Sequence, residues 1–487
     1  MPKDFTPSYA QFKEQWKSYS VIPFILRFKL NLKDVYPPYY SYNQNLKENF
    51  LLDGSGRYSF FPLSGPSQHY IAPSFTKATK TWKLLQQNFK QWHGPKLPSN
   101  FPPFYGGAVG VLSYDAGRIF EKGWKSSPPP NSLKLPLIDF YIYDDLACYD
   151  KKNQEMFIIS CLRKKKTLDP SVELYNEQIR KILNWKTKEM KAEINFKSAQ
   201  ARASFLKLTS GSSSCDQVRV KNKNSTQYIR SLDRIKQYIA QGDIYQANLS
   251  QRIEWKSNMS PEQFYLNLRT INPSPYACLW KTPAYSLASC SPELLLKKRG
   301  NYVETRPLAG TRPRGKDPKL DRILEGELIL NEKERAEHIM LVDLERNDLG
   351  RVCAPGSVYV KKNMAIEKYS HVMHIVSYIE GKLKKSCNFF KALEALFPGG
   401  TITGCPKIRC MEILDELEPV RREIFYGSVG WIGYQGDGEM NILIRTAAIQ
   451  KNKFTIQVGS GIVADSQPKL EFQESLHKAR ALLAASK

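Results

Sequence analysis

The sequence lacks the features that mark membrane proteins, disulfide-rich proteins and metal-cluster proteins. It contains no apolar run long enough to span a bilayer and no apolar leader behind a basic start. Its nine cysteines are scattered, without CxxC pairs or the spacing of a metal site. These absences argue against a membrane span and a structural zinc domain. They predict a cytoplasmic protein with free thiols.

Acidic residues are scarce relative to basic ones. The chain has 72 Lys and Arg against 47 Asp and Glu, a net charge of +25. The basic residues are dispersed, however, and no motif of a nucleic-acid-binding fold accompanies them. The sequence therefore predicts a solvated basic surface that steers anionic substrates or an acidic partner, and no nucleic acid.

The composition divides the 487 residues into three parts without an internal repeat. Residues 1–185 are rich in Tyr, Phe and Pro, with short apolar runs such as 135–143 that predict strands. Residues 186–225 turn to Lys, Ser, Ala and Gly, which predicts a linker. From 226 to 487 strand-like runs alternate with helical ones, and helical spacing over 228–240 predicts a helix. We expect this last part to be catalytic.

The most informative motif spans Phe397–Pro419. Gly399 and Gly400 permit backbone conformations that other residues avoid, and a threonine that follows them can cap a helix. Pro406 suits the first turn of that helix, and Lys407 lies at its start, where free N–H groups favour an anion. Local chemistry is compatible with a well-capped structural helix as well as with an anion site.

Two acidic pairs have the spacing of one helix face. Glu334 and Glu337 lie three residues apart, and Glu471 and Glu474 repeat the spacing with Lys478 one turn further on. Isolated pairs of this kind are mostly solvated helix faces. Two such faces brought together make an all-oxygen site that suits Mg²⁺.

These segments together resemble the signature of the chorismate-utilising enzymes. That family includes anthranilate synthase component I, aminodeoxychorismate synthase component I and isochorismate-forming relatives. The resemblance covers nearly all of 226–487 and extends more loosely over 1–185. It implies an α/β fold of the α+β type: two mostly antiparallel sheets packed together, helices outside, and both halves of the chain contributing.

The resemblance also implies a metal site. Glu337 and Glu474 would ligate Mg²⁺ directly, and Glu334 and Glu471 would act through water. The metal would neutralise the ring carboxylate of the substrate. His374 matches the active-site histidine of the family, although a histidine in an apolar strand is more often a core residue.

Chorismate carries two carboxylates, so its pocket needs cations or N–H donors. Arg445 interrupts an apolar run that predicts a strand, where a bidentate carboxylate contact or a buried ion pair would satisfy it. The glycines of 459–461 suit an anion-binding loop. By resemblance, the substrate-binding residues are Gly310, Thr311, Arg445, Gly459, Ser460 and Gly461. The residues with catalytic roles are Glu293, His374, Gln246 and Lys478.

Two positions distinguish the chemistries of the family. Gln246 stands where isochorismate-forming members carry a lysine base that activates water. Glutamine cannot deprotonate water at neutral pH, which indicates ammonia as the nucleophile. Ala309 stands where some aminodeoxychorismate synthases have a lysine that forms a covalent intermediate, and anthranilate synthases share this alanine. Glu293 matches the general acid for the departing 4-hydroxyl.

Other segments favour the aminodeoxychorismate branch, which supplies p-aminobenzoate for folate. They are 245–249, 398–404, 426–431 and 440–446. The predicted reaction is amination of chorismate at C4. Amination at C2 with loss of pyruvate, as in anthranilate synthase, stays the alternative.

Three further residues bear on ligands. Phe425 replaces a tyrosine of the family, so a hydroxyl contact is lost unless Tyr426 supplies it. Family members often bind tryptophan near a segment that ends here in Gly54, which has no hydroxyl to contribute.

No cysteine lies in the Gly-x-Cys-x-Gly context of a glutaminase, so we expect a separate glutamine amidotransferase subunit to deliver ammonia.

Overall fold

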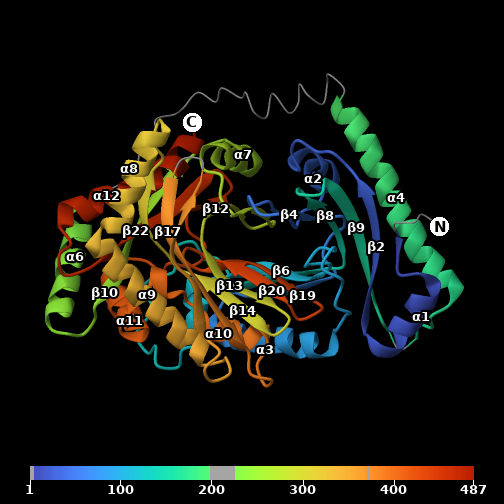
Figure 1. Ribbon diagram of the computed structural model, residues 1–487, viewed down its shortest axis with the longest axis horizontal. Coiled ribbons are helices and arrows are strands. Elements are labelled where there is room, and N and C mark those ends of the chain that lie inside the picture. Colours follow the sequence, from blue (N-terminus) through green and yellow to red (C-terminus); the bar gives the residue numbers. More distant parts are fainter. Residues whose placement is uncertain (1–4, 166, 198–224, 370–371) are drawn as a thin grey trace.

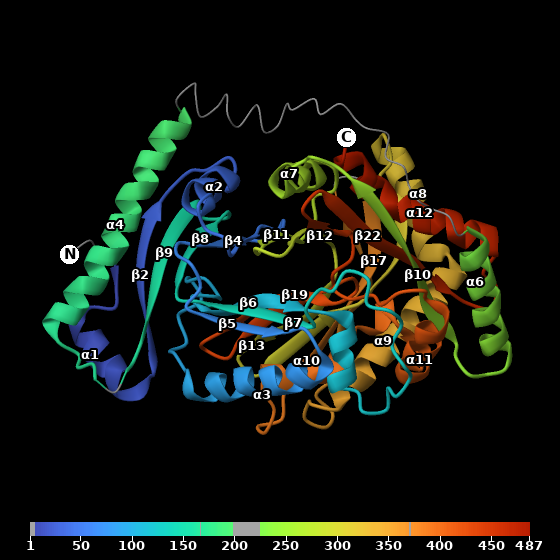
Figure 2. The ribbon, with the colours of Figure 1, turned by 180° about the vertical axis from the view of Figure 1, so that it is seen from behind.

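The computed structural model describes residues 5–165, 167–197, 225–369 and 372–487. Two large sheets face each other, with helices packed outside them (Figures 1 and 2). Every strand pair within the two sheets is antiparallel. The predicted fold class is therefore confirmed. None of the helices in these ranges has the length and apolar character needed to cross a membrane.

The first sheet has 12 strands. In spatial order they are β1 (Phe5–Thr6), β2 (Val21–Lys29), β9 (Glu155–Arg163), β8 (Asp145–Asp150), β4 (Tyr58–Pro62), β3 (Asn49–Leu52), β11 (Tyr276–Lys281), β12 (Ser286–Ser291), β21 (Thr446–Gln450), β22 (Lys453–Ile462), β10 (Gln246–Lys256) and β18 (Gly404–Cys405).

The second sheet has 10 strands. In spatial order they are β15 (Leu308–Pro313), β17 (Val372–Lys382), β14 (Tyr302–Arg306), β13 (Leu294–Arg299), β20 (Gly438–Asn441), β19 (Ser428–Gly433), β6 (Gly107–Leu112), β7 (Ile138–Tyr143) and β5 (Gln68–Ala72), with β16 (Tyr359–Lys368) also paired to β17.

Several helices begin at a polar residue that caps them. Asn331 caps one helix by accepting a hydrogen bond from the backbone of Glu334, and Ser260 and Asp317 cap two others. The helices are α1 (Tyr9–Ser18), α2 (Tyr36–Asn43), α3 (Phe75–Gln91), α4 (Val172–Lys197), α6 (Ser225–Ala240), α7 (Pro261–Ile271), α8 (Pro318–Leu330), α9 (Glu332–Gly350), α10 (Phe389–Leu396), α11 (Lys407–Leu417) and α12 (Pro468–Ala485), with short 3₁₀ turns η1 (Tyr114–Ile119) and η2 (Gly400–Ile402).

Both halves of the chain build each sheet. Strand β3 of the amino-terminal half pairs with β11, and β6 pairs with β19. One apolar core fills the space between the sheets, with Phe50 and Trp280 on one side and Phe140 on the other. A second core lies under α1, α4, α7 and α12. Because β2 and β9 are covered on both faces, they read as continuous apolar runs.

The predicted boundary of the linker is wrong at its start. Residues 186–197 continue helix α4, since the chain keeps helix-favouring Lys, Glu, Ala and Met through this stretch. Residues 198–224, the rest of the predicted linker apart from position 225, lie outside the described residues. The helix predicted over 228–240 and the strand within 135–143 are present as α6 and β7.

Candidate active site

Helices α9 and α12 bring the four predicted metal-site glutamates together. Lys333 joins the two helices, because its Nζ lies 3.9 Å from Glu337 Oε1 and 3.8 Å from Glu471 Oε1. Burial raises the pKa of Glu337 to about 7 against the opposing effect of Lys333. The negative charges of Glu471, Glu334 and Glu474 raise it further. The structure thus creates a concentration of carboxylates that favours a cation.

Glu334 links this acidic group to strand β15. Its Oε1 accepts a hydrogen bond from Arg312 Nη1 at 2.7 Å, whereas its Oε2 is buried and has no hydrogen-bond partner among the described residues. Gly310 lies against that oxygen, and a Cβ at Gly310 would overlap it. Gly310 also has φ +61°, in the left-handed region that favours glycine. The contact explains why this position requires glycine.

The carboxylates do not form a closed metal centre by themselves. Within the described ranges, no three His, Cys, Asp or Glu side chains are grouped so as to hold a metal ion. Basic side chains pair with the carboxylates instead: Lys478 Nζ lies 2.9 Å from Glu474 Oε1. Lys478 also donates to the carbonyl of Gly459 at 3.1 Å. An all-oxygen donor set and the unpartnered Glu334 oxygen nevertheless fit Mg²⁺.

His374 lies on β17 beside the predicted substrate residues. Its Nδ1 is 3.1 Å from the carbonyl oxygen of Gly310 and 2.9 Å from Thr311 Oγ1. The carbonyl only accepts, so the proton lies on Nδ1, and Nε2 accepts from Arg445 Nη2 at 3.3 Å. Burial and the charge of Arg445 lower the pKa of His374 to about 3. The imidazole is therefore neutral at physiological pH.

The prediction that Arg445 lies in a strand is wrong. Arg445 occupies the connection between β20 and β21 with φ +50°. The ladder between β21 and β12 begins only at the next residue, Thr446, because the left-handed backbone at Arg445 does not continue an extended strand. The side chain donates to Asn272 Oδ1 at 3.3 Å. No carboxylate among the described residues pairs with it, and burial lowers its pKa.

Residues 459–461 form part of β22 and not the predicted loop. They pair with β10, which supplies the ladder that a glycine-rich sequence alone does not reveal. The Ser460 hydroxyl lies 3.1 Å from the Tyr228 hydroxyl beneath α6, so only the Ser460 backbone is a candidate for substrate contact. The side chain of Gln246 crosses Gly461, where a Cβ would overlap its amide nitrogen. Gln246 Oε1 is buried and has no partner among the described residues.

Tyr426 approaches the same strand at Gly459, two residues from the contact of Gln246 with Gly461. Its hydroxyl is buried without a hydrogen-bond partner in the described structure, and a Cβ at Gly459 would lie 2.9 Å from it. Phe425 instead lies under Arg252, 5.7 Å from ring centroid to guanidinium carbon. Of the two aromatic residues, only Tyr426 brings a hydroxyl to Gly459.

Glu293 lies in the turn between β12 and β13 and is almost fully buried. Burial raises its pKa to about 8, and the negative charge of Glu345 raises it further. The backbone N–H of Leu308 donates to Glu293 Oε1 at 3.4 Å. A carboxyl with this pKa is protonated at neutral pH and can serve as an acid.

The helix within the motif at 397–419 has a structural role. Helix α11 is preceded by Pro406 as its N-cap residue, and no threonine side chain caps it, contrary to the prediction. The Thr403 hydroxyl instead donates to the carbonyl of Gly399 at 3.0 Å. Lys407 is buried in an ion pair with Asp348, so it is not free for a ligand anion. The interpretation of a structural helix therefore holds for Lys407.

Direct contacts join most of the predicted residues into two groups, and electrostatic effects link the two groups into one site. One group contains His374, Thr311, Gly310, Arg445 and Glu334; the other contains Lys478, Glu474, Gly459, Gln246 and Gly461. The charges of Lys478 and Arg445 both act on His374, and that of Arg445 acts on Glu293. Sequence reasoning missed Lys333, Arg312 and Asn272, which hold predicted residues in place, and Glu345. The sequence offered one sign of a role for Glu345: it is a charged residue, with no assigned function, in the same predicted helix as Glu337.

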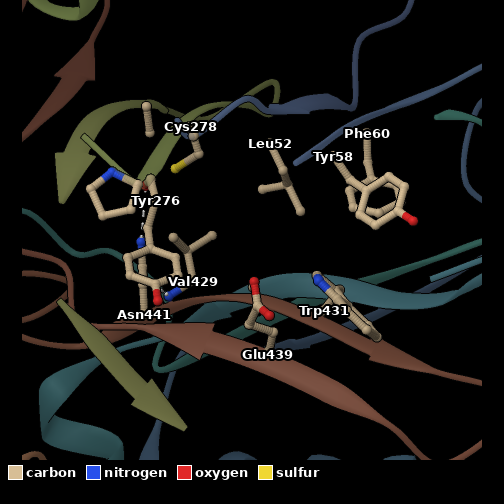
Figure 3. A pocket seen from close by; sticks show the side chains of 13 residues that line it. Leu52, Tyr58, Phe60, Tyr276, Cys278, Val429, Trp431, Glu439 and Asn441 are labelled. Carbon is tan, nitrogen blue, oxygen red and sulfur yellow. Dashed lines mark hydrogen bonds between the residues drawn. The ribbon is translucent and has the colours of Figure 1, made fainter. Parts of the chain in front are cut away.

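A separate small cavity lies between the sheets, away from these contacts. Figure 3 shows Leu52 and Cys278 from one sheet above Trp431 and Glu439 from the other. Its volume of about 70 Å³ has room for several waters. Gly54 packs directly on the carbonyl of Pro275, leaving no space there for a Cβ. The tryptophan contact that sequence comparison implied for this segment therefore has no side chain to supply it at position 54.

The fold and the site define a chorismate-utilising enzyme. The chain belongs to the chorismate binding enzyme family, whose model matches residues 47–484. It is 44% identical over 385 residues to aminodeoxychorismate synthase component 1 of Bacillus subtilis, covering 78% of this chain and 77% of that protein. It is 35% identical over 504 residues to anthranilate synthase component 1 of Acetivibrio thermocellus, covering 99% and 98%.

A solved structure agrees with this assignment. The crystal structure of anthranilate synthase component I from Streptococcus pneumoniae superimposes with a TM-score of 0.70 at 27% identity. The match covers 88% of this chain and 93% of that one. The predicted family is confirmed.

Proposed function

We propose that this enzyme aminates chorismate at C4 with ammonia to give 4-amino-4-deoxychorismate, in a reaction that depends on Mg²⁺. The single observation that carries the nucleophile is Gln246, whose amide lies across Gly461 where a lysine base would activate water. Four segments typical of the aminodeoxychorismate branch support C4, as does the Bacillus subtilis relative.

Each residue of the site has its own role in the proposed reaction. Arg445 binds a substrate carboxylate, because it is a cation with no carboxylate partner among the described residues. Neutral His374 orients Arg445 through Nε2 and is itself fixed by Gly310. Glu293 donates its proton to the departing 4-hydroxyl, which leaves as water. Ammonia loses a proton when the C–N bond forms, and that proton restores the acid.

Mg²⁺, held by Glu337 and Glu474 with Glu334 and Glu471 acting through water, would neutralise the ring carboxylate of the substrate. Lys333 lies close to Glu337 and Glu471, so its ammonium group would give way to a bound metal.

Amination at C2 with loss of pyruvate is the second candidate. Ala309 favours it, because a covalent lysine is absent and anthranilate synthases share the alanine. The Acetivibrio thermocellus relative, which this chain matches over 99% of its length, also favours it.

We expect the purified protein to convert chorismate to 4-amino-4-deoxychorismate when Mg²⁺ and ammonium are both present. Mass spectrometry and fluorescence of the product identify it, and EDTA should stop the reaction. Anthranilate with pyruvate as the main product would contradict the C4 assignment. Isochorismate would contradict the argument from Gln246.

We expect the protein to be inactive with glutamine alone and to use glutamine after a separate glutaminase subunit is added. None of the cysteines has the context of a glutaminase nucleophile, and six of those described are buried with raised pKa values: Cys148, Cys161, Cys278, Cys290, Cys353 and Cys410. Activity is measured with ammonium at raised pH, with glutamine, and with glutamine plus the amidotransferase. Glutamine-dependent amination by the pure chain would refute the prediction.

A further inference from the structure

Two buried carboxyls, Glu293 and Glu345, are held by one short segment that runs from the end of β14 to the start of β15. The Thr305 hydroxyl donates to Glu345 Oε2 at 3.3 Å. Three residues further along, the backbone N–H of Leu308 donates to Glu293 Oε1 at 3.4 Å. Glu293 comes from the turn after β12, and Glu345 comes from α9. One short segment therefore fixes the two carboxyls relative to each other.

A second segment, at η2, holds the same two groups. The backbone N–H of Gly400 donates to Glu345 Oε1 at 3.1 Å. The next residue, Thr401, directs its buried hydroxyl at Glu293, although it does not reach full hydrogen-bond geometry. A Cβ at Gly400 would press on Leu344, so glycine keeps this segment close to α9. The glycine-rich motif thus connects the two carboxyls.

The charges around the pair leave Glu345 without a cation of its own. On the same helix Asp348 adds a negative charge, and from α11 Lys407 adds a positive one. Lys407 is committed to Asp348 and to the carbonyl of Leu396 at 3.0 Å. On the other side, Arg445 is the cation that acts on Glu293. The neighbouring groups of β14 and η2 that touch Glu345 are neutral donors.

We propose that Glu293 and Glu345 form a coupled carboxyl pair, in which Glu345 carries the negative charge and Glu293 keeps the proton. Two carboxyls held this close cannot both ionise readily, so the first negative charge retains the proton on the other group. Glu345 is thereby a positioning residue for the protonation state of Glu293. The proposal rests on the proposed function only in taking Glu293 as the acid.

The titration behaviour of the two groups agrees with this geometry. Burial raises the pKa of Glu345 to about 7, and Asp348 raises it further while Lys407 opposes the shift. The pKa of Glu293 is higher, about 8, with Glu345 among the causes. Both surroundings thus favour the protonated carboxyl, and the negative charge of Glu345 favours the proton on Glu293 further.

We expect Glu345→Gln to shift the alkaline limb of kcat to lower pH. The acid form of Glu293 is the active one, so activity falls as pH rises through its pKa, and removing the neighbouring charge lowers that pKa. The expected shift is about one pH unit, or roughly a tenfold loss of kcat near pH 8.5 with little loss near pH 6, the effect of one nearby like charge. Rates are compared at equal free ammonia.

Matched variants separate this effect from a structural one. Glu345→Asp keeps the charge and should restore the wild-type limb. Glu155→Gln, which removes a carboxylate that pairs with Lys29 in the amino-terminal half, should leave the limb in place. An unmoved limb in Glu345→Gln, or an equal loss at every pH with a lower Tm, would overturn the proposal.

A second measurement needs no turnover. Both folded-state pKa values are raised above the ordinary glutamate value of 4.5, so each carboxyl costs the fold stability as pH rises from that value, and the loss is complete above about 7 to 8. At pH 9, urea unfolding should show that Glu293→Gln and Glu345→Gln each stabilise the protein, and that the double variant gains less than their sum. If the stability changes of the two single variants add up to that of the double variant, the two carboxyls are not coupled and the proposal is refuted. Wild-type turnover by Glu293→Gln would instead refute the acid role in the proposed function.

Discussion

Replacing Glu337 by glutamine is expected to abolish Mg²⁺-dependent turnover while the fold remains intact. The side chain is about a quarter exposed, so the amide is accommodated. The substitution removes one of the negative charges that attract a cation to this site. We expect a loss of at least about 100-fold in kcat/KM, because Mg²⁺ depends on charged oxygen ligands. The measurement is chorismate consumption over a range of Mg²⁺ concentrations, with Tm as the test of folding.

The neighbouring positions supply the controls. Glu332→Gln makes the same change at an exposed position of α9 and should have no effect. Glu474→Gln should match Glu337→Gln, even though Glu474 is half exposed and paired with Lys478. Near-normal rates at saturating Mg²⁺ in either variant would contradict the assignment of that residue to the metal.

The part of the site that could be predicted from sequence is the part carried by helices. Spacing of three residues puts Glu334 and Glu337 on one helix face wherever a helix forms, and Asn331 supplies the cap that starts it. The same spacing correctly predicts that Glu471 and Glu474 lie together on one helix, α12. Their assembly around Lys333 depends on tertiary packing, which no local pattern records.

Predictions about backbone conformation failed where long-range pairing decides. Residues 459–461 have the glycine content of a loop, yet β10 gives them a complete antiparallel ladder. Arg445 follows apolar residues that suit a strand, yet its φ is positive and its backbone turns toward β21. The pairing strands, β10 for residues 459–461 and β12 for the strand that begins after Arg445, lie far away in the sequence, so a pattern read along the chain does not contain them.

Glu345 shows the same limit for function. It is a buried charge on α9 that faces neither solvent nor the metal-site glutamates, and its hydrogen-bond partners come from β14 and η2. Only the meeting of these three segments shows that it lies beside Glu293. The helix thus serves two parts of the site: its first turns supply carboxylates for the metal, and its later turns supply a charge for the acid.

Arg445→Met is expected to lower kcat/KM by roughly 100-fold or more without lowering the stability of the fold. A charged hydrogen-bonded contact that is lost from a buried site costs about 2–5 kcal/mol of binding. Arg445 has no carboxylate partner among the described residues, and burial already disfavours its charge. Methionine removes an uncompensated cation, so the Tm should stay equal or rise while chorismate binding fails.

The combination of lost binding and retained stability is what distinguishes a substrate contact from a structural ion pair. Arg445→Lys keeps the charge but not the planar fork, and should remain well below wild type. Arg299→Met is the matched control: Arg299 pairs with Glu439 at 3.0 Å and lies over the Trp431 ring, so its loss should lower Tm and spare turnover. Steady-state kinetics with chorismate and thermal unfolding are measured on all three variants. A fall in Tm for Arg445→Met with near-normal kcat/KM would show that Arg445 serves the fold and not the substrate.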